Sequence, residues 1–259
     1  MLLSLCASAL YGFIAWRMFR TSPPQPVWLQ ALLSLVLLLH GGLVYESVLG
    51  RGVITLGFGN SLSTIVWLTA ILYWTTSRRT PLIRIQAGVT LFAAVAVLLP
   101  WLFPNAHAIA NSQALALRAH LVVSLLAYSL FAIAALHAVV MATLEKKLHR
   151  GSALSGNVPP LLTLEAVLFK TITVGFVLLT LTVFSGIVFS EELFGKPLQF
   201  THKIVFAILS WMVFGGLLLG RHFRGWRGRM AVYWTLTGFV LLLLAYVGTQ
   251  FVLEVLLQR

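Results

Sequence analysis

Long apolar runs separated by short polar breaks make up most of this chain. Each run is about 20 residues long, which is the length that an α-helix needs to cross roughly 30 Å of hydrocarbon. The runs lack the period-two alternation of barrel strands, so they indicate helices. Seven runs begin near residues 3, 27, 60, 83, 114, 164 and 200, and an eighth follows residue 229. The pattern predicts an all-α, polytopic membrane helical bundle with eight transmembrane helices.

The composition supports the same fold class. Hydrophobic residues make up 59% of the 259 residues and charged residues 9%, a balance that excludes a water-soluble globular protein. Cys6 is the only cysteine in the sequence, so the chain has neither a disulfide framework nor a Cys-x-x-Cys motif for haem attachment or thiol chemistry. We interpret residues 1–259 as a single transmembrane domain.

The net charge of +12 is concentrated in every second polar break. Basic residues follow the first, third, fifth and seventh runs: Arg17 and Arg20; Arg78, Arg79 and Arg84; Lys146, Lys147 and Arg150; Arg221, Arg224, Arg227 and Arg229. This alternation follows the positive-inside rule and predicts that both termini lie on the outer face (N-out/C-out). No basic residue precedes the first run, so we expect a retained helix rather than a signal peptide. The basic breaks therefore set the topology and attract anionic membrane lipid, and no nucleic-acid partner is expected.

Two histidines lie at predicted helix starts on the outer face. His120 lies in the first turns of the fifth run, and Ser124 and Tyr128 follow it at four-residue steps. One face of this helix therefore carries a polar stripe, which we expect to point into the bundle. His202 opens the seventh run. Because both runs travel inward from the outer face, the pattern predicts that His120 and His202 lie at similar depth.

The positions of these two histidines favour metal binding, because a helix N-terminus keeps imidazole in the neutral form that binds metals. Arg118 and Lys203 lie beside them, where they are candidates to hold the carboxylates of a haem whose apolar ring is buried below. Zinc is less suited, because no spacing of Cys, His or carboxylate residues supplies four ligands. We therefore predict a haem b whose iron is held axially by His120 and His202. The alternative is two separate interfacial histidines with no common ligand.

Other residues are candidates for the same site or for local roles. His40 lies in the outer half of the second run, and it either lines the site or packs as a histidine bonded to a neighbouring helix. Arg51 lies in the outer connector 46–59, a candidate lid, and Phe200 opens the seventh run. We predict Arg51 at the haem rim and Phe200 in the pocket. His137, far lower on the fifth run, is interpreted as a local hydrogen-bonding residue.

Four segments resemble a known family when they are taken together and in this order: Arg118–Tyr128 (RAHLVVSLLAY), Lys170–Thr182 (KTITVGFVLLTLT), Gly225–Arg229 (GWRGR) and Thr237–Tyr246 (TGFVLLLLAY). The chain is similar to the CcsA/CcmC-like membrane proteins of cytochrome c assembly, in particular to the small YpjD- and HemX-like members. The resemblance covers most of the chain and implies a multi-pass protein of the bacterial cytoplasmic (inner) membrane. It implies that His120 corresponds to the histidine of the family's fifth-span motif, which is a haem ligand in the members that handle haem.

The chain departs from that family in its outer segment 192–203. The tryptophans of the family's W-G-x-x-W-x-W-D-P-K-E pattern are absent, and only Phe200 and Lys203 keep its last aromatic residue and its lysine. Thr201 and His202 replace the Asp-Pro pair, so His202 is a candidate second ligand. The family's second outer histidine has no match in residues 251–257. We therefore expect haem to be retained or sensed more readily than delivered to an apocytochrome.

These observations predict a haem-binding integral membrane protein that resembles cytochrome c biogenesis factors and holds haem near the outer face. No enzymatic reaction is expected, because the six acidic residues form no carboxylate pair and no nucleophile-base arrangement. The alternative function is a haem-free accessory or regulatory subunit of another membrane protein that keeps the family fold. A third function, small-solute transport, predicts broken helices at midplane depth in matching halves, a pattern that the sequence does not show.

Overall fold

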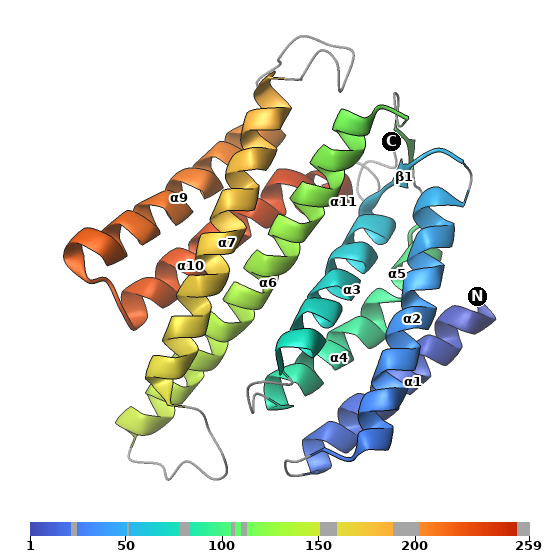
Figure 1. Cartoon of the computed structure of the whole chain (residues 1–259), viewed down its shortest axis with the longest axis horizontal. Helices are drawn as coiled ribbons and strands as arrows, with labels where there is room; N and C mark the ends of the chain where they lie inside the picture. Colours follow the sequence, from blue (N-terminus) through green and yellow to red (C-terminus); the bar gives the residue numbers. More distant parts are fainter. Residues whose placement is uncertain are drawn as a thin grey trace. The chain divides into compact units, whose positions relative to one another are not determined.

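The computed structural model describes residues 1–21, 25–50, 52–77, 83–104, 107–109, 113–150, 160–188 and 202–252. Helices form nearly all of this part of the chain (Figure 1). Contacts divide the chain into two compact units. Unit 1 comprises Met1–Gln113 with Gln250–Arg259, and unit 2 comprises Ala114–Thr249. The single domain over residues 1–259 stays a prediction.

Unit 1 is a ring of four helices to which one short helix is added. Its helices are α1 (Leu2–Arg20), α2 (Val27–Leu49), α3 (Phe58–Ser77), α4 (Ile83–Ala96) and the short α5 (Leu99–Leu102). Helix α1 packs on α2 and α4, and α3 packs on the same two helices, which closes the ring. Helix α5 follows α4 in the chain and packs on α3.

Two connectors of unit 1 meet at one end of this ring. The strands β1 (Thr55–Leu56) and β2 (His107–Ala108) pair antiparallel, and the Ile109 amide donates to the Ile54 carbonyl beside them. Gly59, in the first turn of α3, lies against α5, where a Cβ would come within 2.6 Å of the Leu99 carbonyl oxygen. A glycine is therefore required for this approach of the two backbones.

The interior of unit 1 is unusually polar. His40 is fully buried on α2, and its two ring nitrogens lie 3.2 Å from the Tyr11 hydroxyl of α1 and 3.0 Å from the Ser63 hydroxyl of α3. Other polar side chains are also buried here: Asn60, Ser61, Thr64, Thr69, Gln86 and Thr90. Hydrogen bonds between helices contribute to association in a membrane, where the hydrophobic effect gives little.

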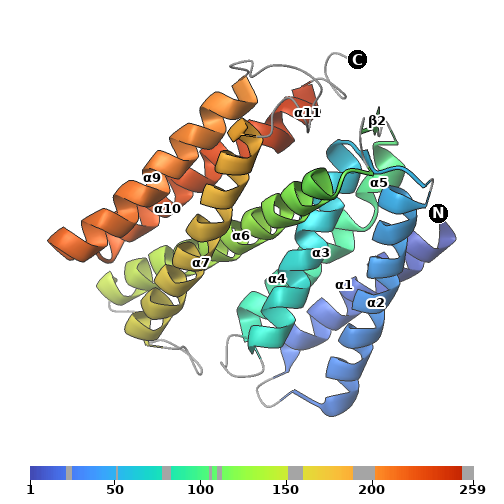
Figure 2. The same ribbon diagram turned by 45° about the horizontal axis from the view of Figure 1, so that its top comes forward.

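Unit 2 is a second ring of four helices (Figure 2). Its elements are α6 (Leu115–His149), α7 (Leu161–Val188), α9 (His202–Arg224), α10 (Arg229–Leu243) and the π-helix η1 (Leu244–Gly248), after which α11 (Thr249–Phe251) passes out of the unit. Helix α6 packs on α7 and α10, and α9 packs on the same two helices. Helices α6 and α9 therefore occupy opposite corners of the ring.

Two phenylalanine rings fill the middle of unit 2. Phe131 of α6 and Phe214 of α9 are fully buried and stacked, with their ring centroids 3.9 Å apart. Glycines of the other two helices lie against them, because a Cβ at Gly175 would meet the Phe131 ring at 3.2 Å and one at Gly238 would meet the Phe214 ring at 2.8 Å. We call this stacked pair the aromatic waist. It fixes how α6 and α9 are aligned along the ring.

Seven helices among the described residues are long and apolar enough to cross a membrane: Leu2–Arg20, Val27–Leu49, Ile85–Leu102, Leu115–His149, Leu161–Val188, His202–Arg224 and Arg229–Phe251. The predicted starts of the runs agree with these helices within a few residues, whereas α6, with 35 residues, is longer than the predicted run of about 20. Helix α3 is not among the seven, although it has 20 residues. Its buried face carries hydroxyl and amide side chains, which lower its hydropathy. The polytopic all-α bundle is confirmed, whereas the count of eight spans and the orientation stay predictions.

Candidate functional site

His120 lies on α6 and is held by the end of α7. Its Nδ1 atom is 2.8 Å from the Ser185 hydroxyl, and the imidazole Cε1 lies 3.5 Å from the position that a Cβ of Gly186 would take. Ser185 also lies 3.1 Å from the Thr182 carbonyl oxygen, to which it donates. We call this end of unit 2, where α6 and α9 begin, the His120 end.

The Ser185 hydroxyl influences the protonation of the imidazole. A hydroxyl carries one hydrogen, and Ser185 has two acceptors within reach, the Thr182 carbonyl and the imidazole. In the tautomer in which the hydrogen goes to Thr182, the Ser185 oxygen accepts from His120 Nδ1–H. In a neutral imidazole of that tautomer the lone pair is on Nε2, the atom that a metal uses. The arrangement therefore supports His120 as a ligand through Nε2.

His202 is the first residue of α9 and is exposed. His120 precedes Phe131 by eleven residues, and His202 precedes Phe214 by twelve. At about 1.5 Å per residue, the two histidines lie about 16 and about 18 Å from the aromatic waist. The stacked rings bring α6 and α9 together at this pair. The similar depth of the two histidines stays a prediction.

The other residues of the polar stripe on α6 reach different partners. The Tyr128 hydroxyl donates to the Leu242 carbonyl at 2.8 Å, across to α10, whereas the Ser124 hydroxyl bonds to the Leu121 carbonyl of its own helix. Leu242 precedes the π-helical segment η1, and such segments often occur at functional sites. Tyr128 therefore has a structural role in joining α6 to α10 beside this irregular turn.

Lys203 approaches the same π-helical segment from α9. Its Nζ atom lies 5.7 Å from the centroid of the Tyr246 ring in η1, a cation-π distance. Arg118 is exposed in the first turn of α6. The structure thus joins His120 to Ser185, Tyr128 to Leu242 and Lys203 to Tyr246, all within unit 2. Arg51 and Phe200 lie outside the described residues, as does the connector 189–201.

His40 lies in unit 1, and its hydrogen bonds to Tyr11 and Ser63 are made within that unit. These bonds correspond to the second alternative, a histidine bonded to neighbouring helices. His137 on α6 has its Nδ1 atom 2.8 Å from the Ile133 carbonyl oxygen of the preceding turn. Its prediction as a local hydrogen-bonding residue is confirmed.

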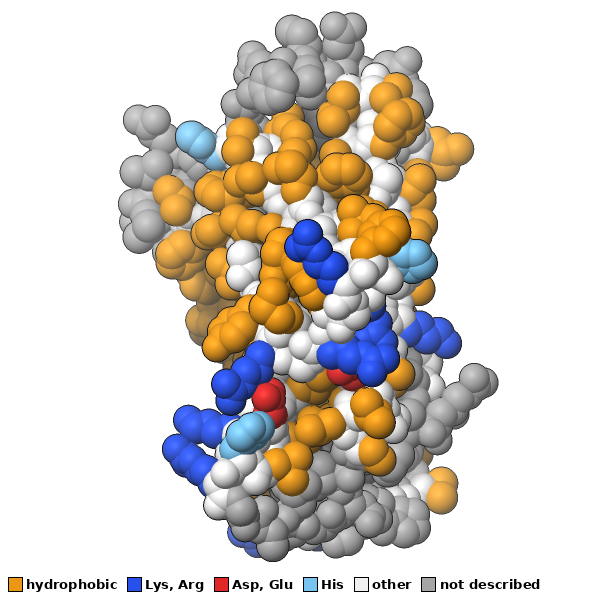
Figure 3. Space-filling model, turned by 90° about the vertical axis from the view of Figure 1, so that its left-hand side faces the viewer, with side chains coloured by type: hydrophobic (Ala, Val, Ile, Leu, Met, Phe, Trp, Pro, Cys, Tyr) orange, Lys and Arg blue, Asp and Glu red, His pale blue; other side chains and the backbone are white. Residues whose placement is uncertain are grey.

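The opposite end of unit 2 carries a charged cluster that the sequence interpretation missed. Glu165 of α7 is buried, with Arg221 Nη1 at 2.6 Å and Arg227 Nε at 3.5 Å from its Oε1 atom. The Arg221 guanidinium also lies 3.8 Å from the centroid of the Phe169 ring. Figure 3 shows one face of the molecule on which Lys and Arg side chains gather toward one end, with acidic side chains among them. The available signal was Glu165 itself, an acidic residue at the start of an apolar run.

Comparison with known proteins identifies the family. The family model described as cytochrome C assembly protein matches residues 28–257. The chain belongs to the cytochrome c assembly protein family. It is 32% identical over 166 residues to the inner membrane protein YpjD of Escherichia coli K12, a match that covers 64% of this chain and 62% of YpjD. It is 37% identical over 87 residues to the cytochrome c biogenesis protein CcsA of Prochlorococcus marinus MIT 9303, covering 34% of this chain and 27% of CcsA.

Membership of the cytochrome c assembly family confirms the resemblance predicted from the sequence, and the match extends through both units. Together with the membrane-length helices and the YpjD relative, it identifies a multi-pass protein of the cytoplasmic membrane. The aligned region spans less than two thirds of YpjD and about a quarter of CcsA.

One segment on which the family resemblance rests now has a physical explanation. The turn between α9 and α10 contains Gly225 and Gly228, whose φ angles of 66° and 53° are unfavourable for other residues. Trp226 folds back onto Gly220, where its ring leaves no space for a Cβ, and lies against Trp234 with ring centroids 4.8 Å apart and the rings tilted by 46°. This turn directs Arg227 to Glu165.

Proposed function

We propose that this member of the cytochrome c assembly family handles haem in cytochrome c biogenesis and holds it at the His120 end of unit 2. Family membership and the CcsA relatives support the biogenesis role. The observation that carries the site is the hydrogen bond from His120 Nδ1 to Ser185, because it orients Nε2 as a ligand atom. When bound, haem supplies an iron that accepts imidazole nitrogens as axial ligands.

The residues at this end suit a haem b with two histidine ligands. His120 would provide one ligand through Nε2, and His202 at a similar level on α9 would provide the second. Lys203 and Arg118 would carry the positive charges that face the haem carboxylates. The aromatic waist supports a site at this end because it fills the interior below the two histidines.

In this proposal the chain holds haem without catalysing a reaction. Two of the described carboxylates, Glu165 and Glu145, are paired with arginines at the other end of unit 2. The remaining role is to bind haem and to present it to a membrane-protein partner or retain it. The absent tryptophans of the outer segment favour retention.

We also propose eight membrane spans with both termini outside. Helix α3 is the eighth span, because it occupies a corner of the unit 1 ring as the other spans do, and its 20 residues extend about 30 Å. In a Cys6→Ala background, Val53→Cys should react with an impermeant thiol reagent from outside. Arg224→Cys should react only after the membrane is opened. The reverse pattern would contradict the orientation.

Absorption spectroscopy tests the haem site. Protein purified from haem-replete cells should show a Soret band and the visible bands of a low-spin b-type haem. His120→Ala and His202→Ala should each remove one ligand and change the spectrum. Ser185→Ala should retain haem but shift the spectrum or the midpoint potential, because the imidazole loses its orienting partner. His40→Ala, in unit 1, serves as the control and should leave the bands unchanged.

Two results would contradict the proposal. One is a protein with no Soret band even after hemin is added. The other is a bound haem whose spectrum is the same in both histidine variants and in the wild type. If the double His120→Ala, His202→Ala variant lacks haem but still captures the same membrane protein from solubilised membranes, the function is that of a haem-free accessory subunit.

A further inference from the structure

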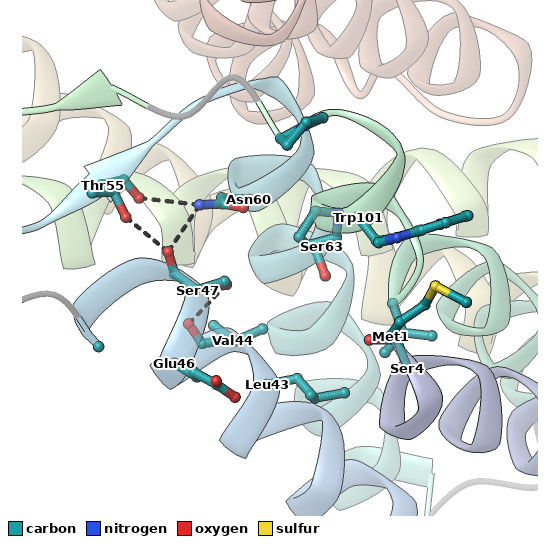
Figure 4. A pocket seen from close by; sticks show the side chains of 14 residues that line it. Met1, Ser4, Leu43, Val44, Glu46, Ser47, Thr55, Asn60, Ser63 and Trp101 are labelled. Atoms are coloured by element: carbon teal, nitrogen blue, oxygen red, sulfur yellow. Dashed lines mark hydrogen bonds between the residues drawn. The ribbon is translucent and has the colours of Figure 1, made fainter.

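Unit 1 contains a pocket that is lined only by residues of this unit. Its volume is about 440 Å³, and it lies between the ends of α1, α2, α3 and α5 (Figure 4). This is within the size range of small-ligand sites. Its polar wall is formed by Ser4, Glu46, Ser47, Thr55, Asn60 and Ser63.

Most donors of this wall are already used within the protein. The Thr55 hydroxyl donates to the Ser47 carbonyl at 2.7 Å, and the Asn60 amide nitrogen donates to the Ser47 carbonyl at 3.0 Å. The Ser47 hydroxyl donates to the Val44 carbonyl at 3.1 Å. What these side chains still offer to a ligand is therefore oxygen atoms that accept hydrogen bonds. These three side chains favour a ligand that donates hydrogen bonds.

The charge of the wall points to a cation. Glu46 is the only acidic residue in the sequence before residue 145. The structure describes three carboxylates, and two of them are paired: Glu165 with Arg221 and Arg227, and Glu145 with Arg229. Glu46 forms no ion pair or side-chain hydrogen bond with any residue in the described part of the chain. In a protein with a net charge of +12, this exposed carboxylate without an ion pair lines the pocket.

We infer that this pocket binds a primary ammonium group, carried by the headgroup of phosphatidylethanolamine or by a free amine. An ammonium ion has three donors and no acceptor, which suits a wall whose charged group is the Glu46 carboxylate and whose other side chains offer oxygen atoms. Trp101 and Leu43 on the rim supply aromatic and apolar surface for the attached carbon chain. The site lies in unit 1 and does not depend on the haem proposal.

The lipid source is tested by native mass spectrometry of the full chain from nanodiscs that contain equal amounts of phosphatidylethanolamine and phosphatidylcholine. If the headgroup binds, the wild type should retain phosphatidylethanolamine through detergent exchange. Glu46→Gln should reduce this retention about tenfold, because a charge-assisted contact is lost. Glu145→Gln removes a carboxylate that is paired with Arg229 and should leave lipid retention unchanged.

The free-amine source is tested by the unfolding temperature in ethanolamine, with ethylene glycol as the uncharged control. If a free amine binds, ethanolamine should raise the unfolding temperature of the wild type but not that of Glu46→Gln. An effect in only one of the two experiments identifies the source. If the wild type and a folded Glu46→Gln variant behave alike in both experiments, the inference is wrong. Neither measurement uses haem, so failure here leaves the haem proposal standing.

Discussion

Unit 1 and unit 2 are both closed rings of four helices, but different side chains hold their interiors together. In unit 1, imidazole and hydroxyl groups bridge neighbouring helices, as His40 does between Tyr11 and Ser63. In unit 2, two phenylalanine rings stack across the ring against glycines, and the ion pairs lie toward one end. Each interior satisfies the requirement that helices in lipid associate by close packing and hydrogen bonds.

The difference between the two interiors explains why hydropathy identifies some helices as membrane spans more clearly than others. An interior built from Phe and Gly keeps its helices apolar, so the spans of unit 2 stand out by hydropathy. An interior built from Ser, Thr and Asn lowers the hydropathy of the helix that carries it, as in α3. A polar residue in a membrane helix can therefore belong to the packing rather than to a ligand site.

The largest expected effect tests the aromatic waist of unit 2. Phe131→Ala should lower the free energy of unfolding by about 3–5 kcal/mol, because it leaves a cavity beside Phe214. The measurement is unfolding in mixed detergent micelles. Phe184→Ala, at a position that is 64% exposed on α7, is the matched control and should change stability little. Equal losses in both variants would show that the waist does not hold unit 2 together.

A smaller effect is expected in the polar interior of unit 1. His40→Leu should lower the free energy of unfolding by about 2–3 kcal/mol, because the hydroxyls of Tyr11 and Ser63 are left without a partner. Adding Tyr11→Phe and Ser63→Ala should recover much of this loss in the same unfolding assay, because no buried polar group then remains unsatisfied. A triple variant that is less stable than the single one would contradict the role assigned to these hydrogen bonds.

The smallest effect concerns the two carboxylates that are paired with arginines in unit 2. Glu165→Gln should lower the free energy of unfolding by about 1–2 kcal/mol, less than for a fully buried pair, because the Arg221 side chain is 29% exposed. Glu145→Gln should cost less than about 1 kcal/mol, since its partner Arg229 is largely exposed. Thermal unfolding of the two variants side by side would decide, and a larger loss for Glu145→Gln would reverse our ranking.

The sequence predicted the helices and their bounds well, because span length is set by membrane thickness. That His120 and His202 lie at similar depth stays a prediction, because residue counting gives the position along each helix axis but not the tilt between two helices. The sequence did not predict that Ser185 bonds to His120, because that pairing depends on how α6 and α7 are rotated about their axes. Hydropathy carries no information about such rotations when every face of a helix is apolar.

Local irregularities were the other features that the sequence interpretation missed. The π-helical turn at Leu244–Gly248 lies within a segment that reads as a regular apolar helix. The pairing of β1 with β2 joins connectors that are about 50 residues apart in sequence, and two-residue strands have no periodicity to detect. Arg221 donates a hydrogen bond to Glu165, and the two residues are 56 positions apart in the chain. Sequence patterns within one helix do not indicate such a pairing.

The stacked Phe131 and Phe214 rings also determine the permeability of unit 2. Both rings are fully buried, and Gly175 and Gly238 press against them from the two remaining helices. An apolar constriction of this kind excludes water, and without a chain of water molecules protons and ions do not cross. A molecule accepted at the His120 end would therefore leave by that end or sideways between helices. The middle of unit 2 then gives ions no path across the membrane while the proposed site holds its ligand.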